Sequence, residues 1–291
     1  MRVSISMTNF TLPGGPPELR DYLTRIARVA DESGIDTLWV PDHLLPADPM
    51  SAIDAPMLEA CTTLGFLAAQ TERVRLGTLV TAVHFRPPSV TVKAISTLDV
   101  LTGGRAWFGI GAGYQQDEAL AMGLSLPSVS ERFERLEETL RLARQMWAGD
   151  TSPFVGVHYR LEHPANSPNT LRRPHPPILV GGAGERRTLR LVARYADACN
   201  LFDIPDGGKT LRHKLAVLAE HCAETDRPYG DIDKTVTTAL APGESAAQFA
   251  RRCADLAKLG AEHIVVITRN VPWTDEAVRI VAAGAADMPQ P

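Results

Sequence analysis

The fold is decided by the stretch ILVGGAGERR, residues 178–187, in which an apolar run leads into glycines and then into a charged segment. Glycine permits a tight turn and close backbone approach to a ligand, and a helix N-terminus presents unpaired N–H groups to an anion. The stretch therefore predicts a strand, a phosphate-binding loop and a helix. The loop consists of Gly181, Gly182, Ala183 and Gly184, with Arg186 and Arg187 near enough to add charge. On these residues alone, a strand-to-helix turn that binds nothing is an equal alternative.

The same strand-to-helix unit recurs along the chain, because short apolar or β-branched runs alternate with longer amphipathic segments. The predicted strands cover residues 3–7, 37–40, 74–80, 106–110, 178–180, 198–201, 235–240 and 263–267. The predicted helices cover residues 17–33, 55–71, 88–101, 130–148, 185–195, 208–225, 244–259 and 274–284. Strict alternation of eight strands and eight helices predicts an α/β fold, a single (β/α)8 TIM barrel over residues 1–291. A doubly wound sheet would also alternate, but its G-x-G-x-x-G fingerprint is absent after the first strand.

Residues 149–177 break this repeat, because they are rich in proline and turn residues. Their one strand-like piece, residues 154–161, alternates valine, tyrosine and leucine in a way that predicts a packed hairpin. A long stretch of this kind inside a compact domain is usually a lid or a binding loop. We therefore expect an insertion near the C-terminal mouth of the barrel.

The overall composition favours a protein without nucleic-acid or membrane partners. The net charge is −4, and the basic residues form no stripe. No apolar run approaches the roughly 18 residues that span a bilayer, and the first residues lack a signal peptide, so we expect a cytoplasmic protein. The cysteines Cys61, Cys199, Cys222 and Cys253 are far apart in the sequence, which indicates reduced thiols. No metal is predicted, because neither HExxH nor a Cys/His cluster occurs.

The residues that follow each barrel strand are the candidate site residues, because active sites of such barrels lie at the C-terminal strand ends. Asp42 and His43 follow the second strand. Histidine is suited to proton exchange near neutral pH, and an adjacent carboxylate can orient it or bind a ligand amide. A helix-capping aspartate beside a surface histidine is the alternative.

Three further strand ends carry candidate ligand contacts. Leu79, Val80, Thr81 and Ala82 could form a smooth wall for a planar ring, although simple core packing would select similar residues. Gly111 and Gly113 leave room for a ligand or for another backbone segment. Asn200 could bond a ligand or close a turn.

Five blocks together resemble a known family. They are WVPDH (39–43), LGTLVT (76–81), GIGAGY (109–114), PILVGGAGERRTL (177–189) and ARYADACNL (193–201). In this order the blocks resemble the bacterial luciferase-like monooxygenase superfamily, and in particular its branch that uses the deazaflavin coenzyme F420. The resemblance implies a barrel with an insertion near its mouth, a small-molecule substrate and a homodimer.

The resemblance also implies roles for single residues. It places the cofactor phosphate on residues 181–184, with Arg186 and Arg187 nearby. It places Asp42 and His43 at the ring system and makes His43 the candidate for proton exchange with substrate. A bulge over residues 79–82, often with a non-proline cis peptide, would back the ring.

One position departs from the family pattern. The sugar-phosphate dehydrogenases of the superfamily carry a glutamate, which acts as a general acid, where this chain has Tyr114. The difference argues against a sugar-phosphate substrate. Glu118 follows one helical turn later, and we expect it not to reach the site because its loop would have to bend back.

The resulting hypothesis is an F420-dependent oxidoreductase in which His43 exchanges the proton that accompanies the hydride. An FMN-dependent two-component monooxygenase is the first alternative, because FMN and F420 share the phosphate that the glycine loop would hold. A non-catalytic F420-binding protein is the second, because Tyr114 replaces the acid.

Overall fold

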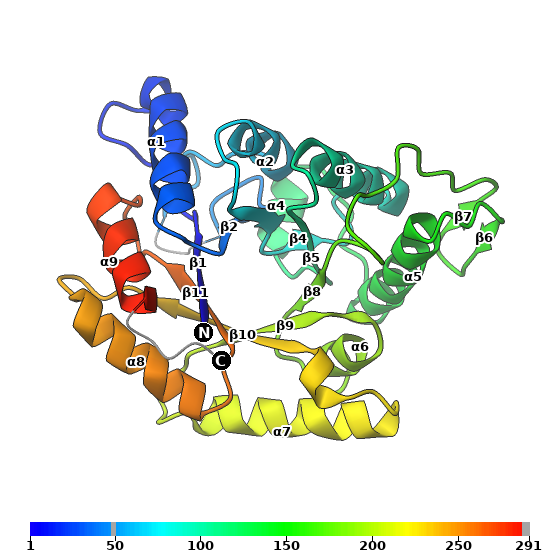
Figure 1. Cartoon of the computed structure of the whole chain (residues 1–291). Helices are drawn as coiled ribbons and strands as arrows, with labels where there is room; N and C mark the ends of the chain where they lie inside the picture. The colour runs from blue at the N-terminus through cyan, green and yellow to red at the C-terminus, as the bar shows by residue number, and fades with distance from the viewer. Residues whose placement is uncertain (48–50, 287–291) are drawn as a thin grey trace.

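The computed structural model describes residues 1–47 and 51–286, and its main sheet is parallel throughout. Its strands are β1 (Arg2–Ser6), β2 (Thr37–Val40), β3 (Arg75–Thr78), β4 (Thr81–Ala82), β5 (Ala106–Gly111), β8 (Ile178–Gly181), β9 (Ala198–Phe202), β10 (Asp233–Ala239) and β11 (His263–Ile267). β4 continues β3 at the same position, and both pair with β5, so the nine strands close into a barrel of eight positions. Figure 1 shows the helices surrounding this barrel. The predicted (β/α)8 barrel is confirmed.

The outer layer consists of one helix after each strand position. These helices are α1 (Leu19–Glu32), α2 (Ala60–Ala68), α3 (Pro88–Leu101), α5 (Val129–Trp147), α6 (Thr188–Tyr195), α7 (Lys209–Glu224), α8 (Ala246–Lys258) and α9 (Asp275–Ala286). Short 3-10 turns cover Pro16–Glu18 and Tyr229–Asp231. None of the helices within residues 1–47 and 51–286 is long and apolar enough to cross a bilayer.

Three of the differences from the predicted elements bear on the site. The third strand does not continue to residue 80 but breaks after Thr78 and resumes at Thr81. The helix expected from residue 55 begins only at Ala60, because the Glu59 side chain accepts bonds from the first N–H groups of the helix. A short helix, α4 (Gln116–Ala121), follows β5 and was not predicted, because six residues are too few to show a helical period.

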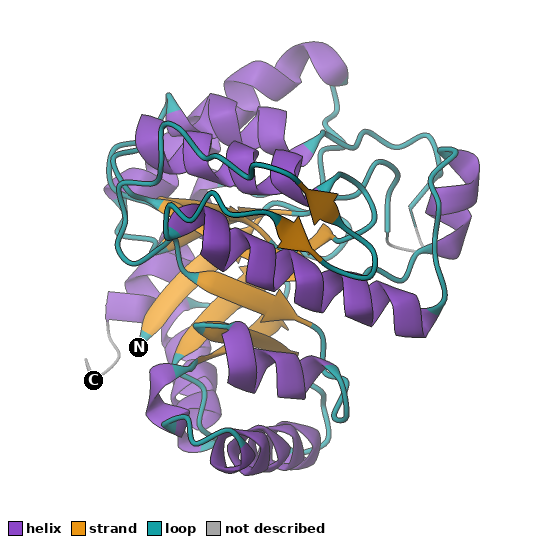
Figure 2. Cartoon of the chain, turned by 90° about the vertical axis from the view of Figure 1, so that its right-hand side faces the viewer, coloured by secondary structure: helices purple, strands orange, loops and turns teal. Residues whose placement is uncertain are grey.

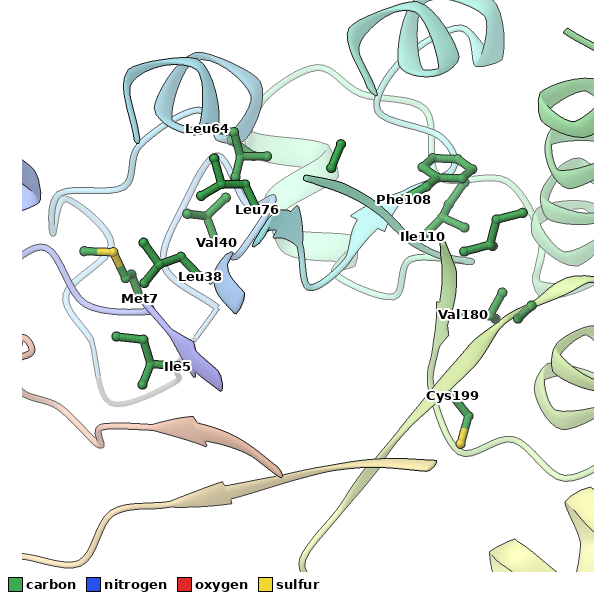
Figure 3. Close-up of a cluster of buried hydrophobic side chains, with 14 of the residues drawn as sticks. Ile5, Met7, Leu38, Val40, Leu64, Leu76, Phe108, Ile110, Val180 and Cys199 are labelled. Carbon is green, nitrogen blue, oxygen red and sulfur yellow. The ribbon is translucent and has the colours of Figure 1, made fainter. Parts of the chain in front are cut away.

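Two hydrophobic layers hold the barrel together, since successive strand residues point to opposite faces of the sheet. Figure 3 shows part of the layer between strands and helices, where Leu76 lies beside Leu64 of α2 and Leu38 lies beside Met7. The second layer fills the barrel interior and includes Trp39 and Trp107, whose ring centroids are 5.5 Å apart. The interior is therefore packed, and open space is left at the ends of the strands.

The insertion forms the predicted hairpin, with β6 (Phe154–Val155) antiparallel to β7 (Arg160–Leu161). Figure 2 shows the hairpin outside the barrel, among the helices. Glu138 of α5 holds the hairpin turn, because its carboxylate accepts hydrogen bonds from backbone N–H groups of residues 157–159 at 2.6–3.1 Å. The hairpin is thus fastened to the outer layer.

The insertion packs on the outside of the barrel against α5 and does not line the cavity at the C-terminal mouth. The residues that line the cavity at the mouth include none from the insertion. Its last part shares a cleft with Arg2 and Arg75, the first residues of their strands, at the opposite end of the barrel. The reason is geometric: a helix that follows a strand runs back to the N-terminal face, so a segment between α5 and β8 begins and ends there.

Candidate active site

A cavity of about 600 Å³ opens at the C-terminal ends of the barrel strands. Ser6, Thr237 and Ile267, which lie at or near the ends of their strands, contribute to its floor. Most of the predicted site residues line it, namely His43, Asp42, Leu79, Val80, Ala82, Gly111, Gly113, Gly181, Gly182, Ala183, Gly184 and Asn200. Residues far apart in the sequence therefore meet at the mouth, as the barrel prediction requires.

Three predicted residues lie outside the cavity lining. The Thr81 hydroxyl donates a hydrogen bond to Asp42 beside the cavity. Arg186 and Arg187 are exposed and line a separate cleft between α5 and α6. The glycine loop does not lead straight into α6, because a turn separates it from Thr188, the first residue of the helix. A role of the two arginines toward the cofactor stays a prediction.

Asp42 is the centre of a buried charge network. Its carboxylate lies 2.5 Å and 3.0 Å from the two terminal nitrogens of Arg86, and its side chain is fully buried. Arg86 also lies 2.5 Å from a carboxylate oxygen of Glu59. Burial alone would raise the pKa of Glu59, but hydrogen bonds from residues 61 and 62 and from Arg86 lower it to about 2. Asp42 is thus tied to Arg86 and caps no helix, which fixes the start of the loop that carries His43.

His43 is held by Glu118 of α4. Nδ1 of His43 lies 2.9 Å from Oε2 of Glu118, whose side chain is 5% exposed. Oε1 of Glu118 accepts hydrogen bonds from the backbone N–H groups of Leu44 and Leu45 at 2.5 Å and 3.1 Å. The expectation that Glu118 would not reach the site is therefore wrong, because α4 turns the chain back over the mouth. The acidic start of this short helix was the signal available in the sequence.

The bond to Glu118 decides which nitrogen of His43 is available. Nδ1 faces a carboxylate, which accepts a proton but donates none when ionised, so Nδ1 carries the N–H in neutral His43. Nε2 forms no hydrogen bond with residues 1–47 or 51–286, and His43 lines the cavity. The imidazole can therefore accept a proton at Nε2 from a group in the cavity.

The side chain of Val80 leaves no room for a Cβ at two positions of the mouth, both of which are glycine. A Cβ on Gly111 would lie 2.9 Å from a methyl carbon of Val80, and a Cβ on Gly181 would lie 2.8 Å from both. The Val80 side chain thus occupies the space that these two glycines leave free. Leu79 and Val80 join through a cis peptide, as the family resemblance implied, and both pack over the interior layer. Of the predicted wall, Leu79, Val80 and Ala82 line the cavity and Thr81 does not.

The glycine loop after β8 offers free backbone donors. The N–H groups of Ala183 and Gly184 donate no hydrogen bond to other described residues, and both residues line the cavity. Gly182 has a φ of +110°, a conformation that residues with a Cβ rarely adopt. A Cβ on Gly184 would lie 2.9 Å from Oγ1 of Thr188. The loop therefore fits a phosphate, with two donors available and little room for side chains around them.

Asn200 is fixed by its neighbours on β10. Its amide nitrogen lies 2.9 Å from the hydroxyl oxygens of both Thr235 and Thr237. Asn200 is buried and lines the cavity floor. The side chain therefore belongs to a rigid part of the wall and closes no turn.

Arg132 and His84 line the cavity and were not predicted from the sequence. Arg132 donates to the carbonyl of Gly113 at 2.5 Å, and the ring of His84 packs so closely on Gly113 that a Cβ there would lie 2.4 Å from it. Burial and the charge of Arg132 lower the pKa of His84. Tyr114 lies at the rim, 67% exposed, with its ring edge-on to His43 at 6.1 Å.

Comparison with known proteins identifies the family. The model of the luciferase-like monooxygenase family matches residues 1–284. A curated F420-dependent glucose-6-phosphate dehydrogenase of Kineococcus radiotolerans is 34% identical over 239 residues, which are 80% of this chain and 66% of that protein. The protein of the same name from Amycolatopsis mediterranei is 32% identical over 231 residues, 78% of this chain and 65% of that protein. The chain thus spans slightly less than two thirds of the length of these relatives.

Solved structures share the fold over nearly the whole chain. An F420-dependent secondary alcohol dehydrogenase superposes with a TM-score of 0.79 at 17% identity, covering 98% of this chain and 99% of the other. A coenzyme F420-dependent tetrahydromethanopterin reductase from Methanopyrus kandleri gives a TM-score of 0.76 at 16% identity, covering 97% and 98%. The family model, the ordered sequence blocks and the barrel agree. The chain belongs to the luciferase-like monooxygenase family.

Proposed function

We propose that this chain is an F420-dependent oxidoreductase that transfers a hydride between the deazaflavin and a small organic substrate. The observation that carries the proposal is His43, whose Nδ1 is held by Glu118 while Nε2 has no partner among the described residues. The names of the relatives from Kineococcus and Amycolatopsis support F420 as the cofactor. They favour F420 over the FMN alternative.

The cavity has suitable places for both ends of such a cofactor. The N–H groups of Ala183 and Gly184 would hold its phosphate, and Val80 would back its ring. When bound, the deazaflavin supplies a two-electron centre that accepts or donates a hydride. The protein contributes position and a cavity with a packed floor.

His43 exchanges the proton that accompanies the hydride, and Glu118 positions His43. When a substrate hydroxyl is oxidised, Nε2 of His43 accepts its proton, and in the reverse direction His43 returns it. The Glu118 carboxylate holds the ring in the tautomer with a free Nε2 and stabilises the imidazolium that forms. Glu118 is thus a positioning residue for His43.

We infer the substrate class from the rim of the cavity. The resemblance places Tyr114 where the sugar-phosphate dehydrogenases carry an acid, so we propose a substrate other than a sugar phosphate. Tyr114, Val129 and Phe202 line the cavity and are 67%, 53% and 53% exposed. Exposed apolar side chains at the entrance favour a substrate with an apolar surface.

We also propose that the protein is a cytoplasmic homodimer. The thiols of Cys61, Cys199, Cys222 and Cys253 are free. A cleft of about 910 Å³ beside α3 is lined by Val90 and Leu101, which are 52% and 71% exposed, and such apolar surface is suited to a second copy. Light scattering after gel filtration measures the mass and tests the dimer directly.

Paired fluorescence titrations test the cofactor. We expect F420 to bind with micromolar affinity or better and FMN to bind more weakly, and we expect reduced F420 to be oxidised by a carbonyl substrate. Oxygen consumption with reduced FMN and no turnover with F420 would support the monooxygenase instead. Tight F420 binding with no redox change across a broad set of alcohols and ketones would support a non-catalytic binding protein.

A further inference from the structure

A cleft between α5 and α6 adjoins the active-site cavity and lies on the outside of the barrel. Its volume is about 240 Å³, and its lining includes Phe133, Arg186, Arg187 and Arg190. Phe133 also lines the active-site cavity, so the two spaces share a wall. We call the part lined by Arg186, Arg187 and Arg190 the arginine cleft.

The acidic residues beside the arginine cleft already have partners. Glu137 lies 2.6 Å from Arg194, and Glu134 lies 2.8 Å from the ring of His158. Among the described residues, the cleft is lined by four arginines, Arg186, Arg187, Arg190 and Arg194, and by only these two carboxylates, so positive charge is in excess.

The three arginines of the arginine cleft, by contrast, form no ion pair with a carboxylate of the described residues. Arg187 lies over the Phe133 ring at 5.6 Å. Arg186 and Arg190 are exposed, and neither forms an ion pair or hydrogen bond within residues 1–47 and 51–286. The cleft therefore carries an excess of positive charge beside an apolar ring.

The arginines follow the phosphate loop closely in the sequence, so the positive charge begins beside that loop. Arg186 lies two positions after Gly184, whose N–H group is free at the phosphate loop. Arg190 lies on α6, Arg186 lies in the turn before that helix, and both line the same cleft. The positive charge thus extends outward from the phosphate loop.

We propose that the arginine cleft binds a chain of carboxylates that continues from the cofactor phosphate. The inference rests on the proposed function, because coenzyme F420 carries lactyl and glutamyl carboxylates beyond its phosphate whereas FMN ends there. Guanidinium groups bind carboxylates through paired, charge-assisted hydrogen bonds, which a flexible, solvent-exposed chain can meet at the surface. Arg186 and Arg187, which the family resemblance placed near the phosphate, are thereby assigned to the carboxylates beyond it.

Binding of two F420 forms tests this inference. One form carries several glutamyl residues, and the other ends at the lactyl group. Fluorescence titration at low salt measures Kd for the wild type and for Arg186→Ala/Arg190→Ala. We expect the wild type to bind the long form about three- to tenfold more tightly, because exposed ion pairs contribute modestly. The double variant should lose this preference and bind the short form as the wild type does.

The control variant is Arg20→Ala/Arg251→Ala, which removes the same charge from exposed positions on α1 and α8. It should keep the preference for the long form, and added salt should reduce that preference in the wild type. Equal binding of both forms by the wild type overturns the inference and leaves the proposed function intact. Failure to bind either form overturns both. A double variant that weakens both forms equally also overturns the inference, since the arginines would then act at the phosphate.

Discussion

Nδ1 of His43 lies 2.9 Å from Oε2 of Glu118, although 75 positions separate the two residues in the chain. The other oxygen of the same carboxylate accepts the backbone N–H groups of Leu44 and Leu45. One buried side chain therefore fixes both the loop after β2 and the imidazole on it. Its charge and its hydrogen bonds can be separated by substitution.

Glu118→Gln should lower kcat while leaving cofactor binding nearly unchanged. The amide oxygen can still accept bonds from Leu44 and Leu45, but the negative charge beside His43 is lost. We expect kcat to fall about 10- to 100-fold, with the Kd for F420 within about twofold of the wild type. A lower melting temperature with an unchanged kcat would assign Glu118 a structural role alone.

His43→Ala should abolish most turnover without releasing the cofactor. Loss of a positioned proton acceptor typically costs about 10²- to 10⁴-fold in rate. Steady-state kinetics and fluorescence titration on the same preparation measure the two effects. The control is His163→Ala, which changes an exposed histidine of the insertion and should leave the rate unchanged. Wild-type turnover by the His43 variant would remove this residue from the mechanism.

Gly181→Ala should destabilise the fold, and Val80→Ala should partly restore it. The added methyl would lie 2.8 Å from two carbons of Val80, and overpacking of this kind costs about 1–3 kcal/mol. Urea unfolding of both single variants and the double variant gives the coupling free energy between positions 181 and 80. Gly65→Ala in α2 is the matched control, since nothing lies within 4 Å of its added Cβ. Additive effects of the two substitutions would contradict the close packing of Val80 on the loop.

Asp42→Asn should be strongly destabilising, because the fully buried carboxylate compensates the charge of Arg86. Removal of one partner from a buried pair costs about 3–5 kcal/mol. Urea unfolding monitored by circular dichroism measures the loss. Asp21→Asn on the exposed face of α1 serves as the control and should change the free energy of unfolding little. An unfolding free energy equal to the wild type would mean that Glu59 alone suffices for Arg86.

His84 should make stability depend on pH. Burial lowers the pKa of His84 from its usual value of 6.5, so the unfolded chain binds a proton there at a higher pH than the folded chain does. The stabilising contribution is therefore complete above pH 6.5 and is lost as the pH falls toward the lowered pKa. Unfolding free energies at pH 7.5 and 5.5 should differ less in His84→Gln than in the wild type. If the free energy of unfolding changed equally with pH in both proteins, groups other than His84 would cause the pH dependence.

The sequence pattern predicts the barrel well because each strand and helix is marked by residues within or next to it. The strands at residues 37–40 and 263–267 and the helix at residues 88–101 have the predicted bounds, since apolar runs and flanking proline mark them directly. The α4 helix gave no such signal because it is shorter than two helical turns. Its absence from the prediction is the reason that Glu118 was assigned away from the site.

The amino-acid pattern alone predicts the order of strands and helices, the barrel and the set of strand ends that face the mouth. Those features follow from periodicity and from the rule that parallel strands end at one face. Three features come only from the packing of the folded chain: Glu118 holds His43, Val80 fills the space beside Gly111 and Gly181, and the insertion lies outside the barrel. Such contacts join residues with no common period, so they are fixed by packing and by the need to pair buried charge.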